Sequence, residues 1–258
     1  MNTLGFIGGG RITRIFLQAM QNKDVALDTI MVSDPDDKTL DKLKSEFRKL
    51  KVTAGSNIEA ASQDVVFLAV HPPVLKEVLP QVAHDVSQAK AVVSLAPVFT
   101  SEKISGMLNG YNKLVRMIPT AASYVNAGYN PVWFSEYIGE TEKNLLQELF
   151  AVLGDCPEVE EDKLEAYAIV TAMGPTYLWP QLNELHKLAL DFGLTEEEAV
   201  SGMKAMVANT MELLYDAGLS YDEVVDLIPV KPLSESEKDF RDVYRTKLSG
   251  LYNKLKGK

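Results

Sequence analysis

Residues 5–13 read GFIGGGRIT and carry the strongest structural signal in the chain. In a dinucleotide-binding fold a strand turns sharply into a helix, with one glycine at the turn and a second where the backbone approaches pyrophosphate. Gly8 and Gly10 stand at these positions, and the amides of Gly10, Arg11 and Ile12 would point at the phosphates from the helix N-terminus. An apolar run precedes the glycines and an amphipathic stretch follows them, as the motif requires. The stretch therefore predicts a cofactor-binding turn, although Thr13 replaces the usual third glycine.

The surrounding sequence alternates short apolar runs with helix-patterned stretches as far as about residue 135. The apolar runs show little alternation, which indicates strands that are buried on both faces of a parallel sheet. This order predicts right-handed βαβ units and an α/β Rossmann fold with a doubly wound sheet. The expected strands are 3–7, 30–32, 65–70, 91–95, 113–118 and 132–134, and the expected helices are 12–20, 38–50, 74–82 and 101–108.

The pattern changes after about residue 154; helix punctuation becomes frequent, and no strand is expected from residue 162 to the end. Ser/Thr residues followed three positions later by Glu form capping boxes, which mark helix starts. Such boxes begin at Thr195, Ser220 and Ser234. We expect a Rossmann NAD(P)-binding domain at residues 1–157 and an all-helical substrate and dimerisation domain at residues 158–258.

Composition narrows the class of protein. The 258 residues carry a formal net charge of −10, which argues against nucleic acid or an anionic membrane as the main partner. A single cysteine, Cys156, excludes an intramolecular disulfide and fits a reducing compartment, so a cytoplasmic location is expected. His71, His84 and His186 lack ligand-like spacing, so no metal site is expected. There is no apolar run of about 18 residues, and the acidic run 158–162 is typical of a solvated linker.

The choice of cofactor depends on the end of the second expected strand. Asp34 stands there, where a carboxylate accepts hydrogen bonds from the ribose hydroxyls of NAD and repels the extra phosphate of NADP. Asp36 and Asp37 add to this repulsion. The same run is also typical of an ordinary turn, and Ser33 with Lys38 could hold a phosphate. The prediction is NAD(P)H, with a slight lean to NADH.

The expected strand 65–70 leads directly to a candidate ligand-contacting segment. Open α/β sheets bind ligands at the carboxyl ends of their strands. Val70, His71 and Pro72 stand at that end, and His71 would lie near the nicotinamide ribose. An ordinary loop histidine at the rim of the cleft is an equally good interpretation of His71.

The order of the motifs GFIGGG, FLAVHPP, VVSLAPV, VRMIPTAA and AMGPTY resembles the Δ1-pyrroline-5-carboxylate reductase family. The corresponding stretches of that family read approximately FIGxGNM, LAVKPQ, SIAAGV, RxMPNTPA and SGSGPAY. The resemblance covers about residues 3–215, and its most specific part combines residues 116–119 with 174–177. It implies a Rossmann domain followed by a helical dimerisation domain, hydride transfer to a small imine, and a homodimer. Carried onto this chain, it also places Ala96 and Pro119 at the cofactor.

The chain departs from the family pattern at several positions. His71 replaces the usual Lys, Thr120 replaces an Asn, and residues 171–173 replace Ser-Gly-Ser. The glycine-rich loop that holds the substrate carboxylate in the family reads PVKPLSE here, at residues 229–235. Proline has no N–H, so this loop offers fewer backbone amides, and Lys231 would supply a point charge instead.

The resemblance implies that the proton donor of the family lies in the replaced loop, so another group must donate the proton in this chain. Tyr177, Thr176 and His71 are the candidates, with water as an alternative. Tyr177 is also readily interpreted as a packing or interface tyrosine.

Two other functions remain open: a carbonyl or alcohol dehydrogenase on the same scaffold, and a non-catalytic dinucleotide-binding protein. A dehydrogenase of 3-hydroxyacids would be expected to carry a lysine within residues 171–182, and none is present.

The last helical stretch predicts an assembly. Phe240, Tyr244, Leu248 and Leu251 give it an apolar face, and helices of about 20 residues gain most of their stability from burying such a face. These side chains should pack on the helical domain or on a partner subunit. With the family resemblance, we expect a homodimer or a larger homo-oligomer that acts on a small imine or carbonyl compound.

Overall fold

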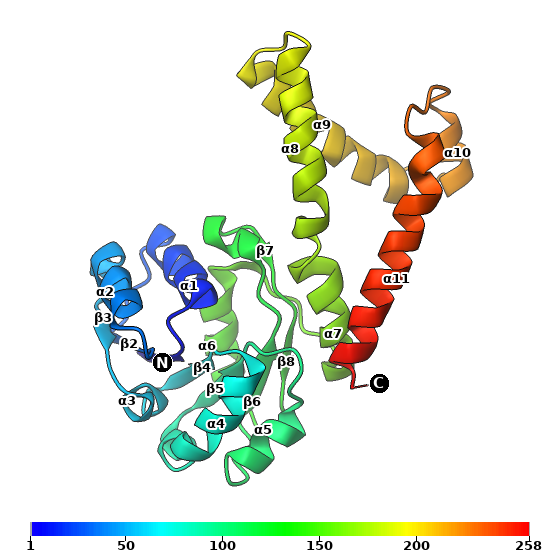
Figure 1. The fold of residues 1–258 in the computed structure, drawn as a ribbon. Coiled ribbons are helices and arrows are strands. Elements are labelled where there is room, and N and C mark those ends of the chain that lie inside the picture. Colours follow the sequence, from blue (N-terminus) through cyan, green and yellow to red (C-terminus); the bar gives the residue numbers. More distant parts are fainter. Residues whose placement is uncertain (1, 258) are drawn as a thin grey trace. The chain divides into compact units, whose positions relative to one another are not determined.

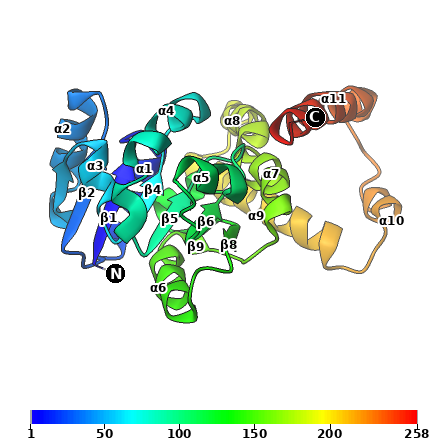
Figure 2. The same ribbon diagram turned by 90° about the horizontal axis from the view of Figure 1, so that it is seen from below.

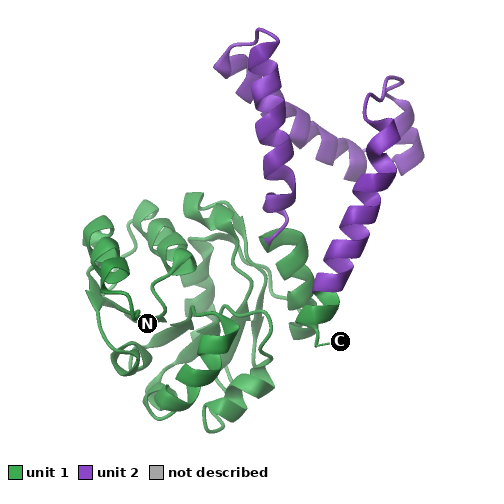
Figure 3. Ribbon diagram, viewed as in Figure 1, with its two compact units in different colours: residues 1–172, 252–258 green, residues 173–251 purple. Residues whose placement is uncertain are grey.

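The computed structural model describes residues 2–257, which form two compact units (Figure 3). Unit 1 comprises Met1–Ala172 and Tyr252–Lys258, and unit 2 comprises Met173–Leu251. The chain therefore leaves unit 1 once and returns to it within its last helix.

Unit 1 is built on a seven-stranded sheet in the order β3-β2-β1-β4-β5-β6-β8 (Figure 1). All neighbours pair in parallel except β6 and β8, which are antiparallel. The order reverses between β1 and β4, which is where doubly wound sheets bind their ligands. The predicted fold class is confirmed. The strands are β1 Thr3–Ile7, β2 Thr29–Ser33, β3 Val52–Ala54, β4 Val65–Leu68, β5 Ala91–Ser94, β6 Leu114–Met117 and β8 Val132–Phe134.

Helices cover both faces of this sheet, and Figure 2 shows α4 and α6 on opposite sides of it. One face packs against α1 Arg11–Asn22, α2 Asp37–Glu46 and α6 Glu140–Ala151. Its centre holds Phe6 stacked on Phe67 at 4.6 Å between ring centroids. The other face packs against α3 Asn57–Ala61, α4 Pro72–Val82 and α5 Ser101–Met107. The smaller elements are the 3₁₀ turns η1 Arg48–Leu50, η2 Asp85–Gln88 and η3 Ala121–Val125, and a parallel pair of β7 Gly128–Tyr129 with β9 Gly154–Asp155.

The end of unit 1 lies beyond the predicted domain boundary at residues 157–158. Residues of η4 Glu161–Lys163, α7 Leu164–Tyr167 and the π-helical turn η5 Ala168–Ala172 belong to this unit. Leu164 and Ala168 are buried against Ile118, directly after β6. The division therefore falls after Ala172, because the apolar side of α7 completes the core of the Rossmann unit.

The regular secondary structure of unit 2 is helical throughout its described residues, as predicted. It contains α8 Pro175–Asp191, α9 Glu196–Tyr215, α10 Tyr221–Asp226, the 3₁₀ turn η6 Ser234–Ser236 and most of α11 Glu237–Leu255. The capping boxes that begin at Thr195 and Ser220 are formed. The third box is wrong, because Ser234 lies inside a 3₁₀ turn that has no side-chain cap. None of the helices within residues 2–257 is long and apolar enough to cross a membrane.

Candidate active site

The turn after β1 has the geometry of a phosphate-binding turn. Gly8 has a φ of +107°, and a Cβ there would lie 2.6 Å from the carbonyl oxygen of Ala69, so only glycine fits. Gly10 is the N-cap of α1 and has no side-chain cap, and a Cβ built on it meets nothing within 4 Å. The first amides of α1, including those of the predicted contacts Arg11 and Ile12, therefore have no side-chain acceptor at the cap. Such an open, positive helix end is suited to an anion.

Thr13 explains how the turn tolerates the loss of its third glycine. Its side chain is fully buried, and its hydroxyl donates a hydrogen bond to the carbonyl of Gly8 at 2.5 Å. The amide of Gly8 in turn donates to the carbonyl of Ser33 at 2.8 Å. Thr13 thus ties the first turn of α1 to the glycine turn that it follows.

The end of β2 is bound to the same turn. The Asp34 carboxylate accepts the amide of Gly9 at 2.8 Å with one oxygen and the amide of Asp36 at 2.9 Å with the other. Ser33 is 3% exposed, and its hydroxyl donates to Asn57 at 2.7 Å. Asp34 therefore lies beside the glycine turn, as a ribose-binding carboxylate must, whereas the Ser33 hydroxyl is already occupied.

The ends of β4, β5 and β6 bring the other predicted cofactor residues to the carboxyl edge of the sheet. Val70, His71 and Pro72 follow β4; Val70 and Pro72 are half-buried, and His71 is exposed at the N-cap of α4. The His71 backbone is extended because Pro72 follows it. Ala96 follows β5 and is 5% exposed, and Pro119 follows β6 and is half-buried.

Thr120, at the position of the family's Asn, is held inside the protein. Its amide donates to the side-chain oxygen of Asn130 at 2.9 Å, and that oxygen also accepts the Ser123 hydroxyl at 2.9 Å. Thr120 is 4% exposed and Asn130 is fully buried. Sequence reasoning missed Asn130, because nothing in its local pattern distinguishes it from a turn residue.

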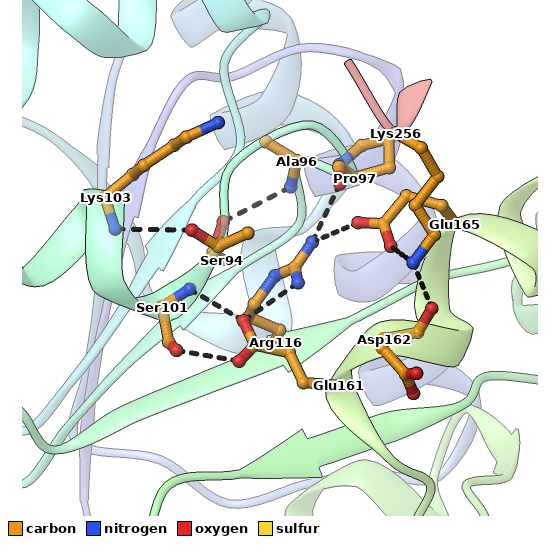
Figure 4. A network of polar contacts seen from close by, with 11 residues as sticks. Ser94, Ala96, Pro97, Ser101, Lys103, Arg116, Glu161, Asp162, Glu165 and Lys256 are labelled. Carbon is orange, nitrogen blue, oxygen red and sulfur yellow. Dashed lines mark hydrogen bonds and ion pairs between the residues drawn. The ribbon is translucent and has the colours of Figure 1, made fainter. Parts of the chain in front are cut away.

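A buried arginine joins three segments near this edge (Figure 4). Arg116 on β6 is 2% exposed and donates to Glu161 at 2.9 Å, to Glu165 at 2.8 Å and to the carbonyl of Pro97 at 2.7 Å. The interpretation of residues 158–162 as a solvated linker is wrong for Glu161, which is bound to Arg116. The partners lie 45 and 49 residues away in sequence, so no local signal could have found them.

The remaining catalytic candidates, Thr176 and Tyr177, belong to unit 2, whereas His71 belongs to unit 1. The Thr176 hydroxyl donates to the carbonyl of Met173 at 2.6 Å, so its proton is already committed. Tyr177 packs edge-to-face against Tyr244 at 5.8 Å between ring centroids. Partial burial and the neighbouring Tyr244 raise the pKa of the Tyr177 phenol. The phenol is protonated at neutral pH, as any tyrosine is, and the rise in its pKa makes it a weaker acid.

The comparisons with known proteins agree with this geometry. Residues 3–97 match the family described as NADP oxidoreductase coenzyme F420-dependent. Pyrroline-5-carboxylate reductase 3 of Xenopus laevis is 26% identical over 81% of this chain and 74% of its own length. A crystal structure of a pyrroline-5-carboxylate reductase from Coxiella burnetii superposes with a TM-score of 0.73 at 26% identity, covering 99% of this chain and 97% of that one. The chain is thus similar to pyrroline-5-carboxylate reductases over most of its length.

The fold extends to more distant members of this group. The pyrroline carboxylate reductase of Plasmodium falciparum, solved with NADP bound, superposes with a TM-score of 0.81 at 20% identity, covering 99% of this chain and 97% of that one. The chain therefore has the architecture of this group. The family match and the relatives at 26% identity make it an NAD(P)-dependent oxidoreductase, and neither of the two alternative functions is favoured.

Proposed function

We propose that the protein reduces a small imine at the expense of NADH, with the cofactor held along the carboxyl edge of the unit 1 sheet. The observation that carries this proposal is the open turn at Gly10, where the uncapped N-terminus of α1 stands at the switch point between β1 and β4. When bound, the nicotinamide supplies the hydride. The residues of the chain bind the phosphates, orient the ring and deliver a proton.

The experiment that tests this turn is a calorimetric titration of NADH into the wild type and a Gly10→Val variant. Gly10 has room for a side chain in the free protein, so the variant should fold, but valine would occupy the space of the pyrophosphate. We expect a wild-type Kd that is roughly micromolar, or about −8 kcal/mol. Unchanged affinity in a folded Gly10→Val variant would show that the cofactor lies elsewhere.

The lean to NADH is supported by charge at the end of β2. Asp34 lies against the glycine turn through Gly9, and Asp36 and Asp37 follow it. A 2′-phosphate placed there would meet several carboxylates, and the Ser33 hydroxyl is bound to Asn57. These contacts support a preference for NADH over NADPH in the proposed site.

Tyr177 is the proton donor that we propose. Its side chain lines a pocket of about 500 Å³ within unit 2, together with Gln181, Phe240 and Tyr244. Thr176 is less suited because its hydroxyl donates to Met173. His71 stays a candidate for orienting the cofactor from unit 1, where it is exposed at the N-cap of α4.

The substrate is proposed to be an imine because the relatives named above act on pyrroline-5-carboxylate. The loop 229–235 replaces the family's carboxylate-holding loop, and Lys231 is the cation available in it. Pyrroline-5-carboxylate is therefore the first compound to test, followed by imines that lack a carboxylate.

We also propose that the protein is a homodimer assembled through unit 2. Of its described residues only Ala199 is buried, and many large apolar side chains on α8, α9 and α11 are exposed. A groove between α8 and α9 is lined mainly by apolar side chains, among them Leu182, Met203 and Val207. Helices with such faces gain stability by covering them.

A cytoplasmic location stays a prediction, which rests on the single half-buried cysteine, Cys156.

A further inference from the structure

The buried Arg116 fastens both loops that are expected to contact the cofactor. One guanidinium nitrogen donates to the carbonyl of Pro97, the residue after Ala96 in the loop that follows β5. Arg116 itself lies on β6, three residues before Pro119. A single rigid side chain therefore fixes the spacing of two neighbouring loops at the carboxyl edge of the sheet.

Glu161 holds the other end of the loop that follows β5, at Ser101. One of its carboxylate oxygens accepts the Ser101 amide at 2.7 Å, and the other accepts the Ser101 hydroxyl at 2.8 Å. The same carboxylate pairs with Arg116 at 2.9 Å. The loop from Ala96 to Ser101 is thus held at Pro97 by the arginine and at Ser101 by its counterion (Figure 4).

A lysine near the end of the chain adds a second cation to this cluster. Arg116 faces two carboxylates, Glu161 and Glu165, and Glu165 is only 6% exposed at its side chain. Lys256 pairs with the second oxygen of Glu165 at 3.1 Å, and it also donates to the carbonyl of Asp162. Two cations then match two carboxylates. An unmatched charge in such a buried cluster is costly, so the other members shift when one is removed.

The contact of Lys256 is not a chance approach of a long side chain. Its neighbour Leu255 packs against the buried residues Ile118, Leu164 and Ala168. Lys256 is also only 20% exposed at its side chain. The last turn of α11 is thereby seated on unit 1 beside Ile118, the residue directly before Pro119.

We propose that Lys256 is a positioning residue for cofactor binding, which acts through Glu165 and Arg116 on the loops at Ala96 and Pro119. Removing its charge lets Glu165 draw Arg116 away from the Pro97 carbonyl, and the two loops lose their spacing. This inference rests on the proposed cofactor site. It predicts a loss of NADH affinity with little change in the rate of the chemical step.

The test compares Lys256→Met with Lys254→Met in the full chain. Lys254 is exposed in the last turn of α11, two residues before Lys256, so its variant removes the same charge without touching the cluster. NADH binding is measured by the change in its fluorescence on titration. We expect Lys256→Met to raise the Kd for NADH about 3- to 10-fold, a size typical of coupling through a packed network. Lys254→Met should stay within about twofold of the wild type, a change well below that coupling, and Lys256→Arg should restore most of the affinity.

Kinetics and a second variant distinguish the positioning role of Lys256 from a purely structural one. If Lys256 acts through the cofactor loops, KM for NADH rises while kcat stays near its wild-type value. In a Glu165→Gln background the Lys256→Met change should have little further effect, because the carboxylate that it balances is gone. Lys256→Gln, which keeps a hydrogen-bond donor, serves if Lys256→Met does not fold.

Each outcome tests either the role of Lys256 or the proposed cofactor site. Equal NADH affinity in the wild type and in folded Lys256→Met overturns the positioning role. Equal losses in Lys256→Met and Lys254→Met overturn it too, because the effect is then one of general charge. A wild type that binds neither NADH nor NADPH removes the proposed cofactor site itself.

Discussion

The two units of the protein bury their apolar side chains to very different extents. In unit 1, two apolar clusters fill both faces of a parallel sheet, and residues such as Phe6, Phe16 and Phe67 are fully buried. In unit 2, side-chain capping boxes begin α9 and α10, yet Ala199 alone among its described residues is buried. Unit 1 therefore has a core of its own, whereas the described residues of unit 2 leave apolar faces exposed, which the proposed homodimer would cover.

The largest expected effect tests the core of unit 1. Phe67→Ala removes a ring that contacts Phe6, Phe16 and Phe150. We expect the free energy of unfolding to fall by about 3–5 kcal/mol. The matched control is Phe192→Ala in unit 2, which is 80% exposed and should cost less than about 0.5 kcal/mol. Chemical denaturation measures both. Similar losses in the two variants would contradict the contrast between the units.

The next effect tests whether unit 2 contributes chemistry. Tyr177→Phe keeps the ring packing against Tyr244 but removes the phenol, so kcat should fall about 10²–10⁴-fold if the phenol donates the proton. Because the pKa of this phenol is raised, the wild-type rate should persist to a pH above the usual range of tyrosine before it declines. A Tyr177→Phe variant with a near-wild-type rate would assign the proton to another group or to water. Thr176→Val is the matched control, since the Thr176 proton is already donated to Met173.

A smaller effect addresses the exposed faces of unit 2. Phe240 is 48% exposed and lies in the apolar pocket beside Tyr177. If a partner subunit covers this face, Phe240→Ala should weaken dimerisation by about 2 kcal/mol, or about 30-fold in the dissociation constant. Sedimentation across a dilution series measures it. A wild type that is monomeric at micromolar concentration would contradict the proposed homodimer.

The smallest effect concerns cofactor choice in unit 1. Asp34→Ser removes the carboxylate beside the glycine turn, so the ratio of kcat/KM for NADH over NADPH should fall about tenfold, equivalent to about 1.4 kcal/mol. Asp37→Ser, on the first turn of α2, is the control for charge alone. A wild type that already prefers NADPH would show that Asp34 is a structural turn residue only.

The same contrast explains what could be predicted from sequence. The glycine turn, the strand order and the helix caps depend on short-range patterns, so the Rossmann fold and two of the three capping boxes were predictable. The strand β3 was missed because its three residues are mostly exposed and carry little apolar signal. Arg116, Glu161, Glu165 and Lys256 were missed as a cluster because three elements distant in sequence bring them together.

The measurement that tests the central claim most directly is NADH oxidation by the purified protein in the presence of pyrroline-5-carboxylate and related small imines. We expect turnover in proportion to enzyme concentration. It should be slower with NADPH than with NADH, and the Gly10→Val variant should lose it. Tight binding of NADH without turnover of any imine would contradict the assignment as an imine reductase and leave only a dinucleotide-binding protein.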